Sequence, residues 1–178
     1  METKRFAVEG SQSSIDWTGK KVTGAHNGTI DIKAGELLLN DGKLAGGNFV
    51  IDTTSIKILD ITDPGYNAQF ASHLFSADFF STEDFPEAQF LITEADHLAG
   101  EGYLITGDLT IKGITHEISF RAEVHVSGDR ITAAGKIVVD RTHYDMKFRS
   151  GNFFTNLGDT LIYNEFELEV QLTAFAAL

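Results

Sequence analysis

The densest group of ionisable side chains in this sequence is the run Asp-Arg-Thr-His-Tyr-Asp at residues 140–145. A histidine flanked by carboxylates is a combination that general acid–base catalysis uses, so one hypothesis assigns acid–base chemistry to this run. The structural alternative is that Arg141 forms an ion pair with a neighbouring carboxylate and fixes a turn. We favour this alternative, because the chain holds 26 Asp and Glu residues and such groupings arise by chance.

The six histidines also have side chains suited to catalysis or metal binding. No two of them stand at i,i+2 or i,i+4, which leaves open only a metal site assembled from distant strands. The chain has no cysteine, and it lacks the G-x-S-x-G, phosphate-loop and dinucleotide-binding glycine motifs. We therefore predict no catalytic residue, no metal site and no cofactor. The rival hypothesis is a hydrolase acting on an apolar substrate with His26, His73 or His143 as base, but no nucleophile accompanies it.

Composition narrows the range of partners. The chain has 14 Lys and Arg against 26 Asp and Glu, a formal net charge of -12, so nucleic acid and anionic membrane surfaces would be repelled. No stretch approaches the roughly 20 apolar residues of a membrane span. The first residues lack the apolar run of a signal peptide. As the chain stands we expect a cytoplasmic protein, or a periplasmic one if an export signal has been removed.

Apolar and polar residues alternate over long stretches, which is typical of strands with one buried and one solvated face. Turn residues such as Asn-Asp-Gly at 40–42 and Lys-Gly at 112–113 separate these stretches. We predict about eight antiparallel strands or a few more. The clearest are at 103–111, 114–126, 131–139 and 166–172, and weaker ones are at 15–17, 30–32, 37–39, 49–51 and 90–92.

One segment departs from this alternation. After Asp63-Pro64-Gly65, apolar side chains recur at helical spacing, which predicts a short helix over residues 66–74. A second helical turn is expected near residues 82–85, with Ser81 as its cap and Asp84 returning the hydrogen bond. Such a helical insert would lie across one mouth of a barrel.

We expect a single all-β domain over residues 1–178. One-faced strands must either close into a barrel or pair as a sandwich, and the length of several strands favours a closed barrel. A barrel of about eight strands either fills its interior with side chains or leaves room for one slim ligand. The residue pattern leaves both open, and a packed interior is the commoner case.

Three ordered stretches resemble the YceI-like family. They are Trp-Thr-Gly-Lys-Lys-Val-Thr-Gly-Ala-His-Asn-Gly-Thr-Ile at 17–30, His-Leu-Phe-Ser-Ala-Asp-Phe-Phe at 73–80 continuing to Phe90, and Gly-Asp-Leu-Thr-Ile-Lys-Gly-Ile-Thr-His at 107–116. The likeness extends from about residue 13 to the C-terminus. It implies an antiparallel lipocalin-like β-barrel with a short helical insert, enclosing an isoprenoid or similar long-chain lipid.

The resemblance makes a hollow barrel the preferred interpretation. The expected function is binding, sequestration or transport of an apolar, polyisoprenoid lipid, such as a quinone tail or an isoprenoid alcohol or phosphate. A ligand-free barrel with a structural or partner-binding role is the third reading, and homodimer formation stays open. Strand phase and the three motifs together predict as lining residues Trp17, Phe49, Phe79, Phe80, Phe90, Tyr103, Ile105, Leu109, Ile118, Phe120, Val124, Phe166 and Leu168. His26, His73 and Arg141 are the predicted contacts to a head group.

Overall fold

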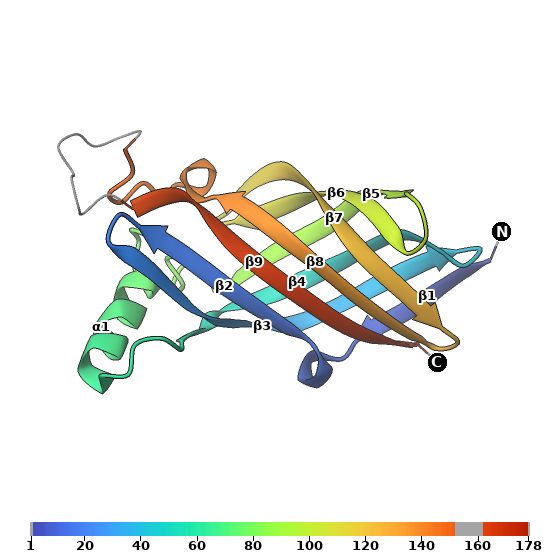
Figure 1. Cartoon of the computed structure of the whole chain (residues 1–178), viewed down its shortest axis with the longest axis horizontal. Helices are drawn as coiled ribbons and strands as arrows, with labels where there is room; N and C mark the ends of the chain where they lie inside the picture. The colour runs from blue at the N-terminus through green and yellow to red at the C-terminus, as the bar shows by residue number, and fades with distance from the viewer. Residues whose placement is uncertain (1, 152–161, 178) are drawn as a thin grey trace.

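The computed structural model describes residues 2–151 and 162–177 of the chain. Its described residues form nine strands, one α-helix and two short 3-10 helices (Figure 1). The strands are β1 Thr3–Val8, β2 Ser14–Lys21, β3 Gly24–Asn40, β4 Lys43–Ile58, β5 Glu87–His97, β6 Gly102–Ile111, β7 Ile114–Ser127, β8 Arg130–Asp140 and β9 Ile162–Ala176. The helices are η1 Gly10–Gln12, α1 Pro64–Phe75 and η2 Arg141–Tyr144.

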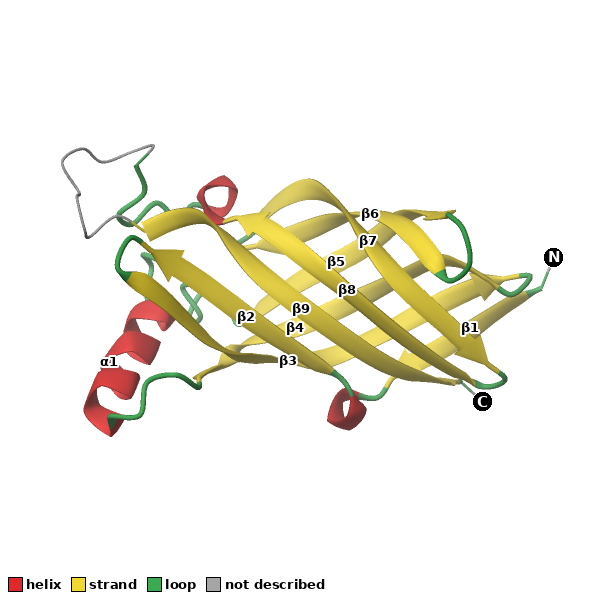
Figure 2. Cartoon of the chain, viewed as in Figure 1, coloured by secondary structure: helices red, strands yellow, loops and turns green. Residues whose placement is uncertain are grey.

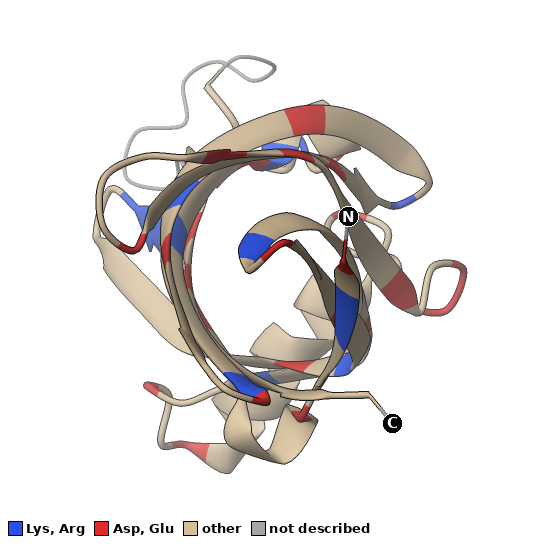
Figure 3. Ribbon diagram, turned by 90° about the vertical axis from the view of Figure 1, so that its right-hand side faces the viewer, with Lys and Arg blue, Asp and Glu red and all other residues tan. Residues whose placement is uncertain are grey.

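All strand pairs are antiparallel, and the sheet closes on itself because β3 pairs with both β2 and β4. The sheet order is β1-β3-β2-β9-β8-β7-β6-β5-β4. β1 and β2 occupy one position in the wall, since both lie between β3 and β9 and are separated only by η1. The barrel therefore has eight strand positions, as predicted, and a view along its axis shows the closed ring (Figure 3).

Strand β6 shows why these sequences form a barrel wall. Its residues alternate between buried and half-buried along the whole strand, and the buried ones are the apolar set that the sequence predicted to share a face. Gly107 belongs to that face, and a Cβ there would lie 2.6 Å from the Phe90 ring. The glycine is required because Phe90 on the neighbouring strand packs its ring directly over the β6 backbone.

Two sequence-based strand predictions are wrong. The separate strands expected at 30–32 and 37–39 are parts of the single 17-residue strand β3. Lys33, Ala34 and Gly35 break the alternation between them, but the β3–β4 ladder continues past them through a register shift at Ile32/Ala34. Strand β1 was not predicted, because it is only 6 residues long and starts beside the chain end.

The helical insert lies at one end of the barrel, opposite the end where the two chain termini lie (Figure 2). Helix α1 begins after Asp63, whose carboxylate accepts hydrogen bonds from the amides of Gly65 and Tyr66 at 2.8 and 3.1 Å. The predicted helix at 66–74 is therefore confirmed with longer bounds. The second turn near 82–85 is also present, as a single turn in which the amides of Asp84 and Phe85 both donate to the carbonyl of Ser81. Its cap differs from the expected one, because the Ser81 hydroxyl donates to the Asp84 carboxylate at 3.4 Å.

The wall has a seam between β7 and β8. Only residues 122–127 of β7 pair with β8. Residues 114–121 pair with β6 alone, and residues 136–140 of β8 pair with β9 alone. At the end of the seam near α1, the ring of His116 on β7 lies 5.1 Å from that of His143 on η2. A ring contact thus connects β7 to the 3-10 helix that follows β8.

The interior is packed at the end near the termini. The apolar side chains there are almost fully buried and form the plug at this end of the barrel: Phe6, Leu39, Tyr103, Ile131 and Ala174. A hydrogen bond also stabilises this end, since the Leu44 amide donates to the Tyr103 hydroxyl at 3.3 Å. Within the described ranges, no helix is both long and apolar enough to span a bilayer.

Candidate functional site

Between the plug and helix α1 the barrel is hollow. The mouth chamber, next to α1, has a volume of about 380 Å³. The inner chamber, deeper toward the plug, has a volume of about 120 Å³. Four side chains line both chambers and form a waist between them: Ile15, Ile51, Leu109 and Leu168. The two chambers therefore adjoin each other inside the barrel, and together they are called the channel here.

The inner chamber is entirely apolar in its described lining. Aliphatic side chains from most strands surround the rings of Phe49, Phe90 and Phe120. Phe90 contacts both of the other rings, with centroid distances of 6.3 Å to Phe49 and 5.7 Å to Phe120. An apolar cavity of this kind stays dry and binds apolar groups.

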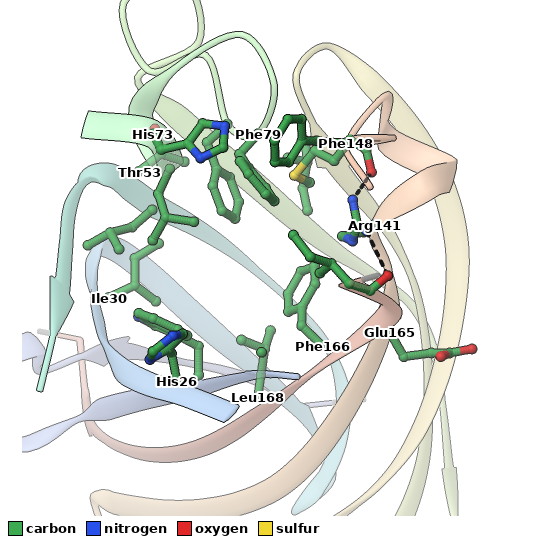
Figure 4. A pocket seen from close by; sticks show the side chains of 18 of the residues that line it. His26, Ile30, Thr53, His73, Phe79, Arg141, Phe148, Glu165, Phe166 and Leu168 are labelled. Atoms are coloured by element: carbon green, nitrogen blue, oxygen red, sulfur yellow. Dashed lines mark hydrogen bonds between the residues drawn. The ribbon is translucent and has the colours of Figure 1, made fainter. Parts of the chain in front are cut away.

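The mouth chamber combines an apolar wall with polar groups, and His26, His73 and Arg141 lie around it on three sides (Figure 4). Phe79, Phe80 and Phe166 supply aromatic rings to its wall. All charged side chains that line the channel in the described residues belong to this chamber. The channel is therefore polar at one end and apolar at the other, as an amphiphile is.

His26 joins the β2–β3 hairpin to the helical insert. Its Nδ1 lies 2.8 Å from Oδ2 of Asp60, and its ring lies 4.8 Å from that of Phe70 on α1. The Asn27 amide donates to the other carboxylate oxygen of Asp60 at 3.0 Å. Burial raises the pKa of Asp60, but the hydrogen bonds from Asn27 and His26 and the charge of His26 outweigh it, so the pKa lies below its ordinary value.

His73 has the same kind of surroundings near the end of α1. Its Nε2 lies 3.1 Å from Oδ2 of Asp78, and its ring packs edge-on against Phe79 and Phe148 at 5.0 and 4.6 Å. Each of the two predicted head-group histidines is therefore placed between a carboxylate and a phenyl ring at the chamber wall.

Arg141 does not form the ion pair that the sequence suggested. Its guanidinium donates to three backbone carbonyls instead: Met146 at 2.6 Å, Tyr163 at 3.0 Å and Ile162 at 3.1 Å. The carboxylate of the neighbouring Asp140 accepts hydrogen bonds from the amide and hydroxyl of Thr142 instead of pairing with Arg141. The expected Arg–carboxylate turn is thus wrong, and Arg141 instead holds the segment after η2 against the start of β9.

Most of the predicted lining residues reach the channel. Trp17, Phe79, Phe80 and Phe166 line the mouth chamber, Leu109 and Leu168 the waist, and Phe49, Phe90, Ile105, Ile118, Phe120 and Val124 the inner chamber. Tyr103 does not line either chamber, since it belongs to the plug. Contact of any of these residues with a ligand stays a prediction.

Sequence reasoning missed several lining residues. Ile15 and Ile51 lie in strands whose alternation is too short to fix an inward face. Met146 and Phe148 lie in irregular chain after η2, where no periodicity exists to reveal them. Phe70 was recognised as helical, but only the tertiary position of α1 turns its ring toward His26.

The described residues offer little catalytic chemistry. They contain no cluster of three or more His, Asp or Glu side chains able to hold a metal ion. Thr53 carries one of the two hydroxyls lining the mouth chamber, and it donates to the Phe85 carbonyl at 2.8 Å. His143, one of the suggested bases, lies outside the lining and stacks on His116.

Comparison with known proteins places this barrel in a family. The YceI-like domain family model matches residues 6–174. The chain belongs to the YceI-like family. Among its relatives, UPF0312 protein plu2095 of Photorhabdus laumondii is 36% identical over 100 residues, which are 52% of this chain and 47% of that protein. Protein YceI of Escherichia coli O157:H7 is 32% identical over 111 residues, 62% of this chain and 53% of that protein. The chain thus matches about half the length of these relatives.

Solved structures share the fold at lower identity. The chain is similar to BcnA of Burkholderia cenocepacia, with a TM-score of 0.69, 21% identity and coverage of 93% of this chain and 98% of that one. It is also similar to a polyisoprenoid binding domain from Saccharophagus degradans, with a TM-score of 0.67, 15% identity and coverage of 97% and 98%. The lipocalin-like barrel is therefore the fold of this YceI-like chain.

Proposed function

We propose that this protein binds a long apolar lipid of the polyisoprenoid class inside its barrel and sequesters or transports it. The observation that carries the proposal is the pair of adjoining chambers inside the barrel, of which the inner one is apolar and the one beside α1 also has polar side chains in its lining. Family membership and the similarity to a polyisoprenoid binding domain support the same function.

The size of the channel agrees with a slim hydrocarbon chain. A cavity of about 150 Å³ holds one benzene molecule, so the mouth chamber and inner chamber together accommodate roughly 20 carbon atoms, or about four isoprene units. Each buried methylene contributes about 0.8 kcal/mol of transfer free energy. A chain of that length is bound tightly without any charged contact.

Binding is favoured over hydrolysis by the surroundings of the candidate bases. His26 and His73 each face a carboxylate and a phenyl ring, and the Thr53 hydroxyl of the same lining donates to the Phe85 carbonyl. A hydrolase needs a nucleophile or an activated water within hydrogen-bond reach of its base.

Native mass spectrometry of protein purified without detergent tests the proposal. We expect an adduct whose mass is that of a lipid extractable into organic solvent. Protein stripped of lipid is then titrated with the neutral apolar fluorophore N-phenyl-1-naphthylamine, and we expect geranylgeraniol to displace it. A protein that carries no adduct and binds neither the fluorophore nor the prenol would overturn the proposal.

A further inference from the structure

Arg141 is a buried cation without a carboxylate partner in the described part of the chain. Only 3% of its surface is exposed. None of the ion pairs formed by described residues includes it. Its three partners are neutral carbonyls, and the one ring beneath it is Phe79, 5.8 Å away. A buried charge without a counter-charge is unfavourable, and proteins usually pair it.

The nearest acidic group does not neutralise Arg141 directly. Asp140 bonds through Oδ1 to Thr142, and its Oδ2 lies 3.5 Å from Nε2 of His143. Desolvation lowers the pKa of Arg141 from its ordinary value, and the charge of Asp140 counteracts only part of that effect. A guanidinium is not deprotonated in proteins, so Arg141 is a cation with no carboxylate in contact with it among the described residues.

Arg141 also keeps unused hydrogen-bonding capacity. A guanidinium has five N–H donors, and the three carbonyls occupy one on Nε, one on Nη1 and one on Nη2. One donor on each terminal nitrogen is left. Two N–H donors are the number that a bidentate contact to a carboxylate or phosphate uses.

Most of the other charged residues that line the mouth chamber are also cationic. Lys20, Lys21 and Arg149 also line it, against the single carboxylate of Glu165. The Glu165 side chain points away from the chamber (Figure 4). Lys20 is the weakest of these cations for a ligand, since its ammonium lies 3.7 Å from Glu167. A protein of net charge -12 thus concentrates positive charge around the polar end of its apolar channel.

We propose that the mouth chamber binds the oxyanion head group of an anionic amphiphile on Arg141, while the hydrocarbon tail passes the waist into the inner chamber. This inference rests on the proposed function and adds the chemical class of the head group. A neutral quinone or alcohol leaves the buried guanidinium without a counter-charge, whereas a carboxylate or phosphate supplies one. The rim lysine Lys21 adds attraction without burial.

Three ligands with the same 20-carbon tail test the proposal: geranylgeraniol, geranylgeranoic acid and geranylgeranyl phosphate. Each ligand is titrated at low ionic strength into lipid-stripped protein that holds N-phenyl-1-naphthylamine, and displacement of the fluorophore gives its affinity. We expect at least one anion to bind about tenfold more tightly than the alcohol, the effect of one charge-assisted pair in a buried site. The stronger of the two anions identifies the head group as carboxylate or phosphate.

Substitutions test whether the preference for anions over the alcohol depends on Arg141. Arg141→Gln is expected to bring the affinities of the anions to within about twofold of that of the alcohol, both measured on the same variant. The matched control is Arg121→Gln, which removes the same charge from an exposed residue of β7 and should keep the preference. Urea unfolding of both variants checks the fold, because Arg141 also holds three carbonyls. Lys21→Gln, which does not touch those carbonyls, is expected to lower the ratio of anion affinity to alcohol affinity.

The outcomes separate the two proposals. Wild-type protein that binds the alcohol as tightly as both anions overturns the head-group inference and leaves the lipid-binding function intact. So does a preference for anions that survives in a folded Arg141→Gln protein. Failure of all three ligands to displace the fluorophore counts against the lipid-binding function itself.

Discussion

The imidazole of His26 and the carboxylate of Asp60 lie 2.8 Å apart and connect the β2–β3 hairpin to the segment that leads into α1. Both side chains are about 30% exposed, at 27% and 30%, so the pair is only partly screened by solvent. The Asn27 amide holds the same carboxylate, which fixes the orientation of the pair. This contact is the main polar link between the helical insert and the barrel wall beside His26.

The pKa of Asp60 predicts how the link depends on pH. Because its folded pKa lies below the ordinary 3.8, ionised Asp60 stabilises the fold above that value, and this stabilisation is lost as the pH falls through the lower folded pKa. Asp60→Asn should lower the free energy of unfolding by about 1 kcal/mol at neutral pH and by almost nothing near pH 2. Urea unfolding across this range measures the difference. Asp16→Asn, at an exposed residue of β2, is the control, and its free energy of unfolding should change with pH as that of the wild type does. If the free energy of unfolding of Asp60→Asn also followed the wild-type pH dependence, the prediction would be contradicted.

Gly19 offers a way to fill the mouth chamber without disturbing the wall. It lines that chamber, and a Cβ added to it meets no atom within 4 Å. Gly19→Leu should therefore raise the free energy of unfolding by about 1 kcal/mol and weaken binding of a 20-carbon prenol by about tenfold, because the side chain takes the space of the ligand. Thr18→Leu, on the neighbouring residue that does not line the channel, should leave binding unchanged. Equal loss of binding in both variants would argue against the mouth chamber as the site.

Two buried tyrosines should respond in opposite ways to loss of their hydroxyl. The Tyr144 hydroxyl has no hydrogen-bond partner among the described residues, and burial raises the pKa of Tyr144 to about 12, so it stays neutral. Tyr144→Phe is expected to raise the free energy of unfolding by about 1 kcal/mol, whereas Tyr103→Phe should lower it by a similar amount because the Leu44 amide loses its acceptor. Paired urea titrations measure both. A destabilised Tyr144→Phe protein would mean that this hydroxyl has a partner outside the described residues.

Alternation in the sequence predicted which residues of a strand face inward. It did not predict where along the barrel axis each of them lies. The inward faces of β6, β7 and β9 follow from period-two patterning, and this patterning together with the family motifs predicts Leu109, Phe120 and Phe166 as lining residues, as the structure has them. The same patterning could not tell a plug residue from a lining residue, because both face inward, and Tyr103 was assigned to the wrong group. Only the position along the barrel axis separates them.

The surroundings of Arg141 were beyond sequence reasoning for another reason. Neighbours along the chain suggested a carboxylate partner, but the 3-10 helix η2 directs the Asp140 and Arg141 side chains apart. The carbonyls that Arg141 contacts come from residues 5, 21 and 22 positions away. Backbone acceptors exist at every residue, so composition gives no sign of which ones a buried guanidinium will contact.

The seam between β7 and β8 should be visible in amide hydrogen exchange. Amides of residues 114–121 that face β8 have no partner in that strand, whereas residues 122–127 pair with it. We expect the first group to exchange much faster than the second in lipid-free protein, measured by NMR. The β6-facing amides of the same segment provide the internal control, since they belong to a complete ladder. Uniform protection along β7 would show that the seam is closed in solution.

This incomplete ladder lets the diameter of the barrel change at the inner chamber. Ile118 and Phe120 on one side of the seam and Ile137 on the other all face the inner chamber. Outward displacement of β7 at this place breaks no hydrogen bond to β8, so a thicker cargo such as a methyl-branched tail costs less distortion here than where the strands are laddered. The absence of a few strand pairs between β7 and β8 thus lets the inner chamber accept lipid tails of different shapes.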